Sequence, residues 1–238
     1  VLINTDTYLD SNFLNNLVKA AKENKEAGII APLVIMYFSQ DKINSTGLLL
    51  YKDGAAKDRG FLEPTSKLFP KEVFGASGAA VLYKKEMLND ISISGEYFDE
   101  DFFAYGEDLD LSFRAKLIGW KCIFTPEAKI YHKINATSKK TPGLKVYFGA
   151  RNKILFIIKN YPTKILIQFL PIILTRQILS IIYFLAKPEF LKILKARYDA
   201  LKLVPKMLKK RKIIQKNMNV PISEVKFWFE NRNLWQKD

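Results

Sequence analysis

The sequence predicts a mixed α/β fold, with a sheet in the first part of the chain and helices in the last part. Short apolar runs alternate with amphipathic stretches over residues 1–138, and this alternation is typical of a sheet covered by helices. From about residue 140 the composition changes to long apolar and basic stretches with helical spacing. A hydrophobic content of 48 % over 238 residues allows a packed core and excludes a globally disordered chain.

Each element is predicted from a local pattern. Ser11 is a candidate N-cap, since a serine hydroxyl can accept a hydrogen bond from a free N–H group at a helix start. Acids at 107 and 108 complement a helix dipole, and Gly119 favours a helix end. In order, we expect the end of a buried strand at 1–3, a helix over 12–25, strands over 28–38 and 45–54, a small-residue turn with a strand and a short helix over 74–88, a helix over 107–119, and strands over 121–126 and 128–132.

Positive charge is concentrated in the helical part. The chain has a net charge of +14. Residues 139–216 hold nineteen Lys and Arg against two acids, Glu189 and Asp199, which gives +17 and leaves −3 for the rest. We therefore expect three parts: a sheet domain over 1–138, a basic amphipathic helical region over 139–216 and a tail over 217–238. The basic region should meet an anionic partner, such as a membrane surface, a nucleic acid or a phosphorylated substrate.

Three helices are expected in this region, over 142–162, 163–188 and 189–217. The stretch 165–186 is long enough to cross a bilayer, which takes roughly 20 residues. It also carries Gln168, Arg176 and Gln177, and a central Arg costs about 2.5–3.5 kcal/mol on insertion. Three placements remain open: an interfacial or re-entrant helix, a true span, and a buried helix. The next stretch has leucines at helical spacing among lysines, which is typical of a helix on anionic lipid.

Acids and a histidine mark candidate chemistry in the sheet part. Asp6 follows the first strand, at the sheet edge where open α/β folds bind ligands. A carboxylate there can hold Mg²⁺ or Mn²⁺ and, through the cation, a diphosphate; it can equally be a turn residue. His132, the only histidine, ends an apolar strand and can be structural or a metal ligand. Glu107 and Asp108 are adjacent acids beside aromatic residues, suited to a general base or simply to a helix start.

Two further features are less specific. The turn "FGASGAA" (74–80) has small residues that let a backbone approach phosphates or sugars, although tight packing explains it equally well. Asp110 and Arg114 lie four residues apart in the predicted helix, which favours a salt bridge. The single cysteine, Cys122, excludes an internal disulfide.

Taken together, the order of these motifs resembles the family 2 glycosyltransferases, in particular the rhamnosyltransferase-like branch, over about residues 1–160. The resemblance lies in four segments: "VLINTDT", "FGASGAAVLYKKEML", "FDEDFFAYGEDLDLSFRAKLIGWKCIFTPEAKIYH" and "YFGARNKILFIIKNYP". It implies a GT-A fold, which is a Rossmann-like sheet, with "NTD" at the family's metal motif. The chain then corresponds to the C-terminal portion of such a domain. A portion lacking the nucleotide-binding strands is not expected to bind nucleotide or fold stably alone.

The resemblance also implies roles for single residues. Asp6 corresponds to the metal ligand with His132 as a further ligand, and Asn4 stands in the first motif position, where the family more often has Asp. Asp108 corresponds to the general base and Glu107 to an acceptor-orienting partner. The remaining matched positions are Gly75, Ala76 and Gly78 in donor binding, Trp120 as a wall near the site with Arg114 in the acceptor region, and Arg151-Asn152 with no assigned role.

The implied function is metal-dependent, inverting transfer of a hexose or deoxyhexose. The sugar would pass from a nucleotide-diphosphate donor to a saccharide or lipid-linked acceptor, in cell-surface polysaccharide synthesis. The expected location is the cytoplasmic face of an anionic membrane, with no nucleic-acid partner. Two alternatives stay open. One is a basic membrane- or nucleic-acid-binding module centred on "KMLKKRKIIQK" (206–216), and the other is a membrane-anchored scaffold without activity.

Overall fold

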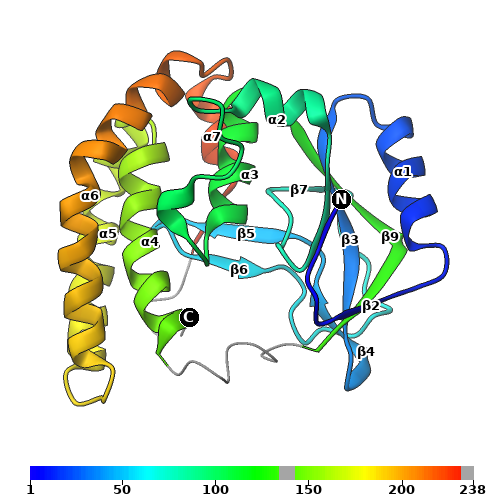
Figure 1. The fold of residues 1–238 in the computed structure, drawn as a ribbon, viewed down its shortest axis with the longest axis horizontal. Coiled ribbons are helices and arrows are strands. Elements are labelled where there is room, and N and C mark those ends of the chain that lie inside the picture. Colours follow the sequence, from blue (N-terminus) through cyan, green and yellow to red (C-terminus); the bar gives the residue numbers. More distant parts are fainter. Residues whose placement is uncertain (134–142, 232–238) are drawn as a thin grey trace.

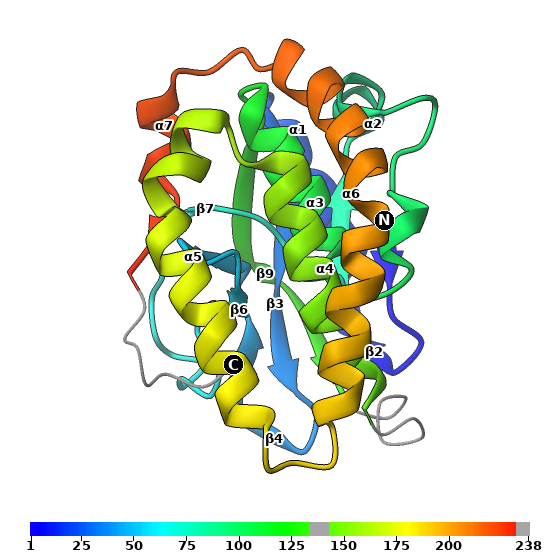
Figure 2. The same cartoon turned by 90° about the vertical axis from the view of Figure 1, so that its left-hand side faces the viewer.

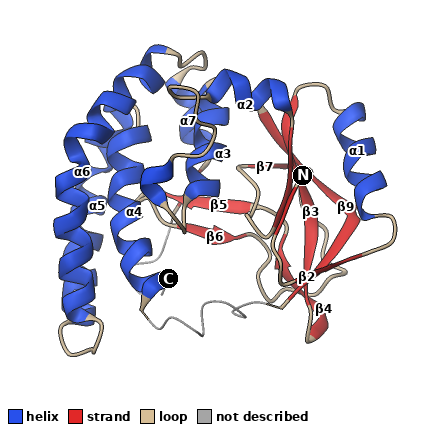
Figure 3. Cartoon of the chain, viewed as in Figure 1, coloured by secondary structure: helices blue, strands red, loops and turns tan. Residues whose placement is uncertain are grey.

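A seven-stranded mixed sheet and a group of long helices occupy opposite sides of the protein in the computed structural model, which describes residues 1–133 and 143–231 (Figure 1). The sheet contains β1 (Leu2–Ile3), β2 (Thr7–Leu9), β3 (Ala27–Met36), β4 (Ser39–Ser45), β7 (Glu72–Val73), β8 (Ala80–Tyr83) and β9 (Lys121–His132). Its order is β1-β8-β3-β9-β2, with β4 beside β3 and β7 beside β9. Figure 3 shows this separation of strands from the long helices.

Three strands of this sheet point the same way. β3 and β9 are parallel, and β8 is antiparallel to both β3 and β1. The carboxyl ends of β1, β3 and β9 therefore lie at one edge of the sheet, where ligands bind in open α/β folds. This edge is the one that carries Asp6 and His132.

Helices cover both faces of β3, whose side chains alternate between two cores. On one face α1 (Phe13–Glu23) buries Phe13 and Leu17 against Ile30 and Val34. On the other face α2 (Lys85–Ile91) and α3 (Glu107–Leu117) pack in a core that includes Ile29, Leu33, Met87, Leu111 and Ala115. The predicted helices at 12–25 and 107–119 and the predicted strand at 28–38 are thus confirmed within a few residues.

The helical part shares a core with the sheet part. It contains α4 (Leu144–Asn160), α5 (Thr163–Phe184), α6 (Phe190–Lys216) and α7 (Ile222–Phe227). One hydrophobic cluster joins Phe113 of α3 to Phe156 of α4, Ile165 of α5 and Ala200 of α6. Figure 2 shows α4, α5 and α6 side by side on the face away from the sheet. The three predicted parts are therefore not independent units, and the predicted boundary at 138 lies outside the described residues.

The segment expected to be a tail returns to the body of the protein. Within it, β10 (Phe229–Glu230) pairs in parallel with β5 (Leu48–Tyr51), which also pairs with β6 (Ala56–Asp58). Phe229 packs against Tyr161 and Phe169. Burial of these aromatic rings explains why the 217–238 segment is not a detached tail over its described residues.

Several local expectations are corrected. Leu2 and Ile3 are exposed rather than buried, because β1 lies at the sheet edge. Asn12, not Ser11, precedes α1, and no side chain caps that helix. The strands expected at 121–126 and 128–132 form one strand, β9, whose register against β3 shifts between Pro32 and Leu33.

A buried ionic network fixes the helices to α3. Lys159 Nζ lies 2.7 Å from Asp110 Oδ1 and 2.7 Å from Asp99 Oδ2. Asp110 also pairs with Arg114 at 2.9 Å, and Lys210 of α6 reaches Asp99. All five side chains are largely shielded from solvent. Buried charges are stabilised only when each one is paired.

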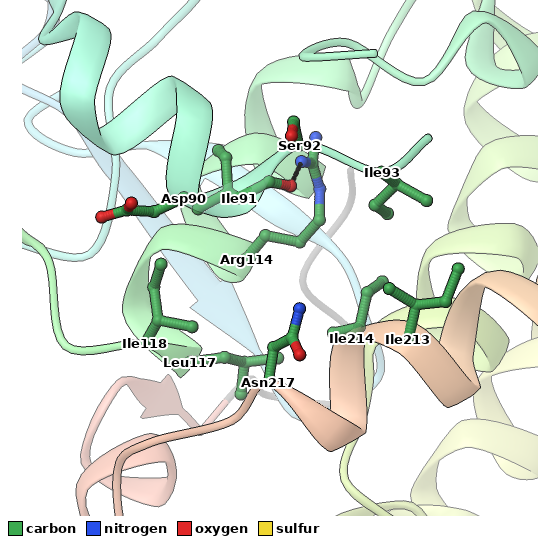
Figure 4. Close-up of a pocket in the computed structure, with 10 residues that line it drawn as sticks. All are labelled: Asp90, Ile91, Ser92, Ile93, Arg114, Leu117, Ile118, Ile213, Ile214 and Asn217. Atoms are coloured by element: carbon green, nitrogen blue, oxygen red, sulfur yellow. Dashed lines mark hydrogen bonds between the residues drawn. The ribbon is translucent and has the colours of Figure 1, made fainter. Parts of the chain in front are cut away.

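A small cavity lies beside this network, between α3 and the end of α6 (Figure 4). Its volume is about 20 Å³, and Arg114, Ile118 and Asn217 are among its lining residues. Arg114 Nη1 donates to the Ile91 carbonyl at 2.6 Å within the same region. The space suits about one water molecule and is too small for a sugar. The substrate site must lie elsewhere.

Candidate active site

Asp6 and His132 meet at the carboxyl edge of the sheet. Thr7 of β2 pairs with His132 of β9, and this pairing brings the turn after β1 beside the end of β9. His132 Nε2 lies 3.2 Å from Asp6 Oδ1, and both side chains are mostly buried. The two predicted metal ligands are therefore adjacent in the fold.

Asn44 orients the histidine ring. Its Oδ1 lies 2.7 Å from His132 Nδ1, and the Asn44 side chain is buried. An amide oxygen can only accept, so Nδ1 carries the proton and Nε2 faces Asp6. A hydrogen-bonded partner on the second ring nitrogen is typical of metal-binding histidines. The sequence offered no signal for Asn44, because it stands just before the predicted strand at 45–54 and resembles a turn residue there, whereas the structure places it in β4.

Asp6 and His132 are the side chains at this edge that could hold a divalent cation together with oxygen atoms of a substrate. The carboxylate oxygen of Asp6 suits both Mg²⁺ and Mn²⁺ as a ligand. The ring nitrogen of His132 suits Mn²⁺ better than Mg²⁺. Across the described residues, no group of three or more His, Cys, Asp and Glu side chains is suited to a metal. In such a site Asp6 and His132 would supply two ligands and a diphosphate would supply others, as is usual for Mg²⁺ sites in nucleotide-dependent enzymes.

Hydrogen bonds connect this edge to the acidic pair on α3. The Asn4 N–H donates to the Ala79 carbonyl at 3.0 Å, and the Gly78 N–H donates to Asp108 Oδ2 at 2.9 Å. The turn at 74–80 therefore connects the Asn4–Asp6 segment with the first turn of α3. The structure brings together Asn4, Gly78 and Asp108, three of the residues predicted from widely separated motifs.

The small residues of the turn have different surroundings. A Cβ on Gly75 would lie 2.4 Å from Ser112 Cβ, so this glycine lets α3 approach the sheet closely. Ala76 is buried in the core beneath α3. A Cβ on Gly78 would instead lie 3.5 Å from Asp108 Oδ2. Packing thus accounts for Gly75 and Ala76, whereas Gly78 lies at the site and donates its N–H to Asp108.

The acidic pair has a raised proton affinity. Glu107 and Asp108 follow Gly106, which has φ +97° and precedes α3. Burial, followed by the negative charge of Asp108, raises the pKa of Glu107 to about 7. Burial also raises the pKa of Asp108, although N–H groups of Gly78 and Leu109 oppose that rise. The helix dipole favours the ionised form of Asp108, and desolvation opposes it, so that the pKa of Asp108 lies above its ordinary value.

Asp58 is a further acid near the pair that sequence reasoning missed. It ends β6, and its carboxylate carries an oxygen buried from solvent. Burial raises the pKa of Asp58 to about 6, and the negative charge of Asp108 adds to that rise. The sequence "AAKDRG" holds nothing to distinguish this Asp from a turn residue. Its proximity to Asp108 arises from the three-stranded sheet of β10, β5 and β6.

Trp120 and Arg114 are not at this site. Trp120 follows the last turn of α3, about 15 Å along the helix from Glu107. It packs against Gly28 and donates its indole N–H to Asp90. The predicted wall of the site is instead part of the core at the opposite edge of the sheet. Arg114 is buried, and its guanidinium binds Asp110 and two backbone carbonyls, so its structural interpretation is correct.

Comparison with known proteins gives one family. The model of a family described as "Glycosyl transferase family group 2" matches residues 1–191. This range includes Asp6, Gly78, Glu107, Asp108 and His132, which are the residues that the fold brings to the site. A search of curated proteins finds no match.

Proposed function

The chain belongs to glycosyl transferase family group 2, since the match covers residues 1–191 of 238. We propose that it transfers a hexose or deoxyhexose from a nucleotide-diphosphate donor to a saccharide or lipid-linked acceptor. Its sheet and following helices agree with the predicted GT-A type domain. The observation that carries the proposal is the hydrogen-bonded bridge from Asn4 through Ala79 and Gly78 to Asp108, which connects the segment that contains Asp6 to the buried acidic pair of α3.

In this proposal each residue has one task. Asp108 accepts the proton of the acceptor hydroxyl as its oxygen attacks the anomeric carbon, because its raised proton affinity suits a base. Glu107, beside it, orients the acceptor. Asp6 and His132 would hold Mg²⁺ or Mn²⁺, which when bound would offset the negative charge of the leaving nucleoside diphosphate. One direct displacement inverts the anomeric configuration.

The surface of α5 supports a membrane location. Among the described helices, Thr163–Phe184 is long and apolar enough to cross a membrane by length and composition. Its exposed apolar side chains recur every three or four residues and so share one face. They are Ile167, Leu170, Leu174, Ile178, Ile182 and, just after the helix, Leu185, which we call the α5 apolar face.

Two polar residues of α5 point the other way. Arg176 Nε lies 3.8 Å from Asp53 Oδ2, and Arg197 of α6 donates to Gln177. Arg176 and Gln177 therefore face the protein, whereas Gln168 is exposed beside Ile167 at the margin of the α5 apolar face. Ile165, Phe169 and Ile173 bury the opposite side of the helix in the core. This arrangement favours the interfacial placement over the span and over the buried helix.

The neighbouring helix α6 adds positive charge to this side. Its exposed Leu191, Tyr198 and Leu201 alternate with exposed lysines such as Lys202 and Lys209. A basic amphipathic helix of this kind binds anionic lipid headgroups. The cytoplasmic leaflet is the anionic one, so we propose peripheral attachment there, in the synthesis of cell-surface polysaccharide.

The test uses the full-length protein with a panel of nucleotide sugars, including deoxyhexose donors, in the presence of Mn²⁺ or Mg²⁺. Transfer to a saccharide or lipid-linked acceptor, with an inverted anomeric signal by NMR and loss of rate with chelator, is the expected result. Absence of transfer and of donor hydrolysis across the panel would favour a scaffold without activity. Salt-sensitive binding to RNA or DNA in place of vesicles would favour the nucleic-acid module.

A further inference from the structure

The loop that leads into the acidic pair has an unusual backbone. Between the short helix η1 (Glu100–Phe102) and α3, three residues adopt positive φ: Phe103 at 60°, Tyr105 at 66° and Gly106 at 97°. Two of these are bulky aromatic residues, which rarely adopt such angles. Conformations of this kind persist only where the surroundings hold them, and they gather at functional sites. Glu107 and Asp108 follow immediately, so the loop determines where their carboxylates lie.

A buried amide on α4 holds this loop. Asn152 is 2 % exposed, and its Nδ2 lies within hydrogen-bond distance of three backbone carbonyls: Phe102 at 2.9 Å, Ala104 at 2.8 Å and Tyr105 at 2.7 Å. These carbonyls belong to the residues around the unusual angles. A single side chain thus contacts the loop on both sides of Phe103.

Arg151 completes the attachment. Its Nη2 donates to the carbonyls of Asp101 at 2.6 Å and Phe102 at 3.0 Å. Its Nε donates to Asn152 Oδ1 at 2.9 Å, which turns the Nδ2 group of Asn152 toward the loop. The guanidinium also lies over the Phe148 ring, on which the 76 % exposed Phe103 stacks with centroids 5.2 Å apart.

We propose that Asn152 and Arg151 are positioning residues for the transfer reaction. They fix the loop 101–106 so that α3 begins with Asp108 against the Gly78 N–H. The proposal rests on the proposed function, in which Asp108 is the base. Neither residue contacts the reacting atoms in it; each acts through the backbone that precedes Glu107. A purely structural role would lower stability without changing kcat in the folded enzyme.

The experiment compares Asn152→Asp, which keeps the shape of the side chain but removes its N–H donors, with Arg151→Lys, which keeps the charge but not the forked geometry. Leu155→Val, in the buried face of the same helix, is the matched control for lost stability. The measurements on full-length protein are kcat, KM for the nucleotide-sugar donor, and hydrogen exchange of the amides of residues 103–107.

We expect kcat to fall about 10–100-fold in both variants, with the donor KM little changed, since misplacing a catalytic group by about 1 Å can cost roughly 10²-fold. Loop amides should exchange faster, and neither change should appear in Leu155→Val. If the loop exchanges faster while kcat stays at the control value, the residues are only structural and the proposal is overturned. If the wild type transfers no sugar, the proposed function fails, and unchanged loop exchange in the variants would then overturn the attachment as well.

Discussion

His132 Nε2 lies 3.2 Å from Asp6 Oδ1, and Asn44 Oδ1 lies 2.7 Å from the other ring nitrogen. Each contact limits what the ring can do: Asn44 fixes the proton on Nδ1, and Asp6 places a carboxylate beside Nε2. Two potential ligands are thus held side by side at the edge where three parallel strands end.

The first prediction concerns this pair. In the full-length protein, Asp6→Ala should abolish metal-dependent transfer, because a neutral side chain cannot replace a carboxylate on a cation bound to diphosphate. His132→Ala should weaken Mn²⁺ binding and move the preference toward Mg²⁺. Asn44→Leu should weaken Mn²⁺ binding about 10–100-fold by freeing the ring.

The measurement is titration of Mn²⁺ and Mg²⁺ by calorimetry in the presence of a nucleoside diphosphate. Asn16→Ala is the control, since the Asn16 side chain also makes a long-range hydrogen bond, to the Glu127 carbonyl, but lies on α1. Unchanged Mn²⁺ titration curves in His132→Ala would return His132 to a structural role. An Asp6→Ala enzyme that keeps most of its rate at limiting metal would show that the assignment of Asp6 is wrong.

The second prediction concerns Asp108, on which the reaction type rests. Asp108→Asn keeps the size of the side chain but cannot accept the acceptor proton. We expect kcat to fall by roughly 10²–10⁴, with donor binding little changed. A loss of about 1 kcal/mol in the free energy of unfolding should accompany it, since Asp108 accepts from the N–H groups of Gly78 and Leu109 and an amide has one acceptor oxygen.

Donor affinity by calorimetry and transfer rate are measured on the same Asp108→Asn preparation. Loss of both together would indicate that Asp108 organises the turn rather than accepts a proton. Retention of both would exclude the inverting mechanism proposed above.

The third prediction uses the raised pKa of Glu107. Burial and the charge of Asp108 raise this pKa from an ordinary 4.5 to about 7. Between these values the folded state binds more protons than the unfolded state, so stability falls as pH rises. Glu107→Gln should therefore be more stable than wild type at pH 8, on the order of 1–3 kcal/mol, with little difference at pH 4.

Urea unfolding of both proteins from pH 4 to pH 8 gives this difference, because titrating groups that do not interact with Glu107 cancel in the comparison. A difference that is constant with pH would mean that Glu107 ionises as freely in the folded state as in the unfolded one.

The parts of the fold that the sequence predicted are those with strong periodicity or a charged boundary. The buried run in β3 and the acids and Gly119 around α3 are examples. Strand β4 was missed because "SQDKINS" is polar along most of its length, and it is held by pairing with β3 rather than by its own pattern. Two-residue strands such as β7 and β10 are defined by their partners and have no local signal.

Within the candidate site, the closeness of residues that are distant in the sequence could be predicted only from their order in a family motif. The adjacency of Asp6 and His132 and the contact of Asp108 with the turn at 74–80 agree with that order. Trp120 was misplaced because the motif gives its order along the chain but not that a whole helix separates it from Asp108. Asn152 lies in a matched segment but was assigned no role. Its side chain contacts the backbone carbonyls of a loop whose angles no sequence pattern indicates.

The fourth prediction tests the α5 apolar face. Replacing Leu174 and Ile178 together by Glu should weaken binding to anionic phospholipid vesicles at least roughly tenfold, because each leucine or isoleucine contributes through burial in lipid. Leu68→Glu is the control, since Leu68 is 94 % exposed but lies outside the helices. Deletion of residues 161–238 is not a suitable test, because Ile165 and Phe169 belong to the core shared with α3.

Co-sedimentation with vesicles at low and high salt is the measurement. High salt should partly release the wild type by screening its lysines. Wild-type protein that does not sediment with anionic vesicles at low salt would contradict membrane attachment, and resistance to carbonate extraction from native membranes would favour a span.

The last prediction concerns Lys159, which is fully buried between Asp99 and Asp110. Burial alone would raise the pKa of Asp110, but the positive charges of Lys159 and Arg114 lower it below its ordinary value. Lys159→Met removes one cation and leaves two buried carboxylates with less compensation. We expect a loss of about 3 kcal/mol in the free energy of unfolding at pH 7. Lys195→Met, which breaks an exposed pair with Asp199, should have a much smaller effect.

The pH dependence separates charge from packing in this prediction. An acid with a lowered pKa stabilises the fold above its ordinary pKa, and that stabilisation is lost as pH falls through the lowered value. Without Lys159 the pKa of Asp110 rises, so acid unfolding should begin at a higher pH than in wild type. Adding Asp110→Asn to Lys159→Met removes an uncompensated charge and should restore part of the stability at pH 7. If the double variant is instead less stable than Lys159→Met by the full cost of the single Asp110→Asn change, the two residues act independently and the loss is one of packing.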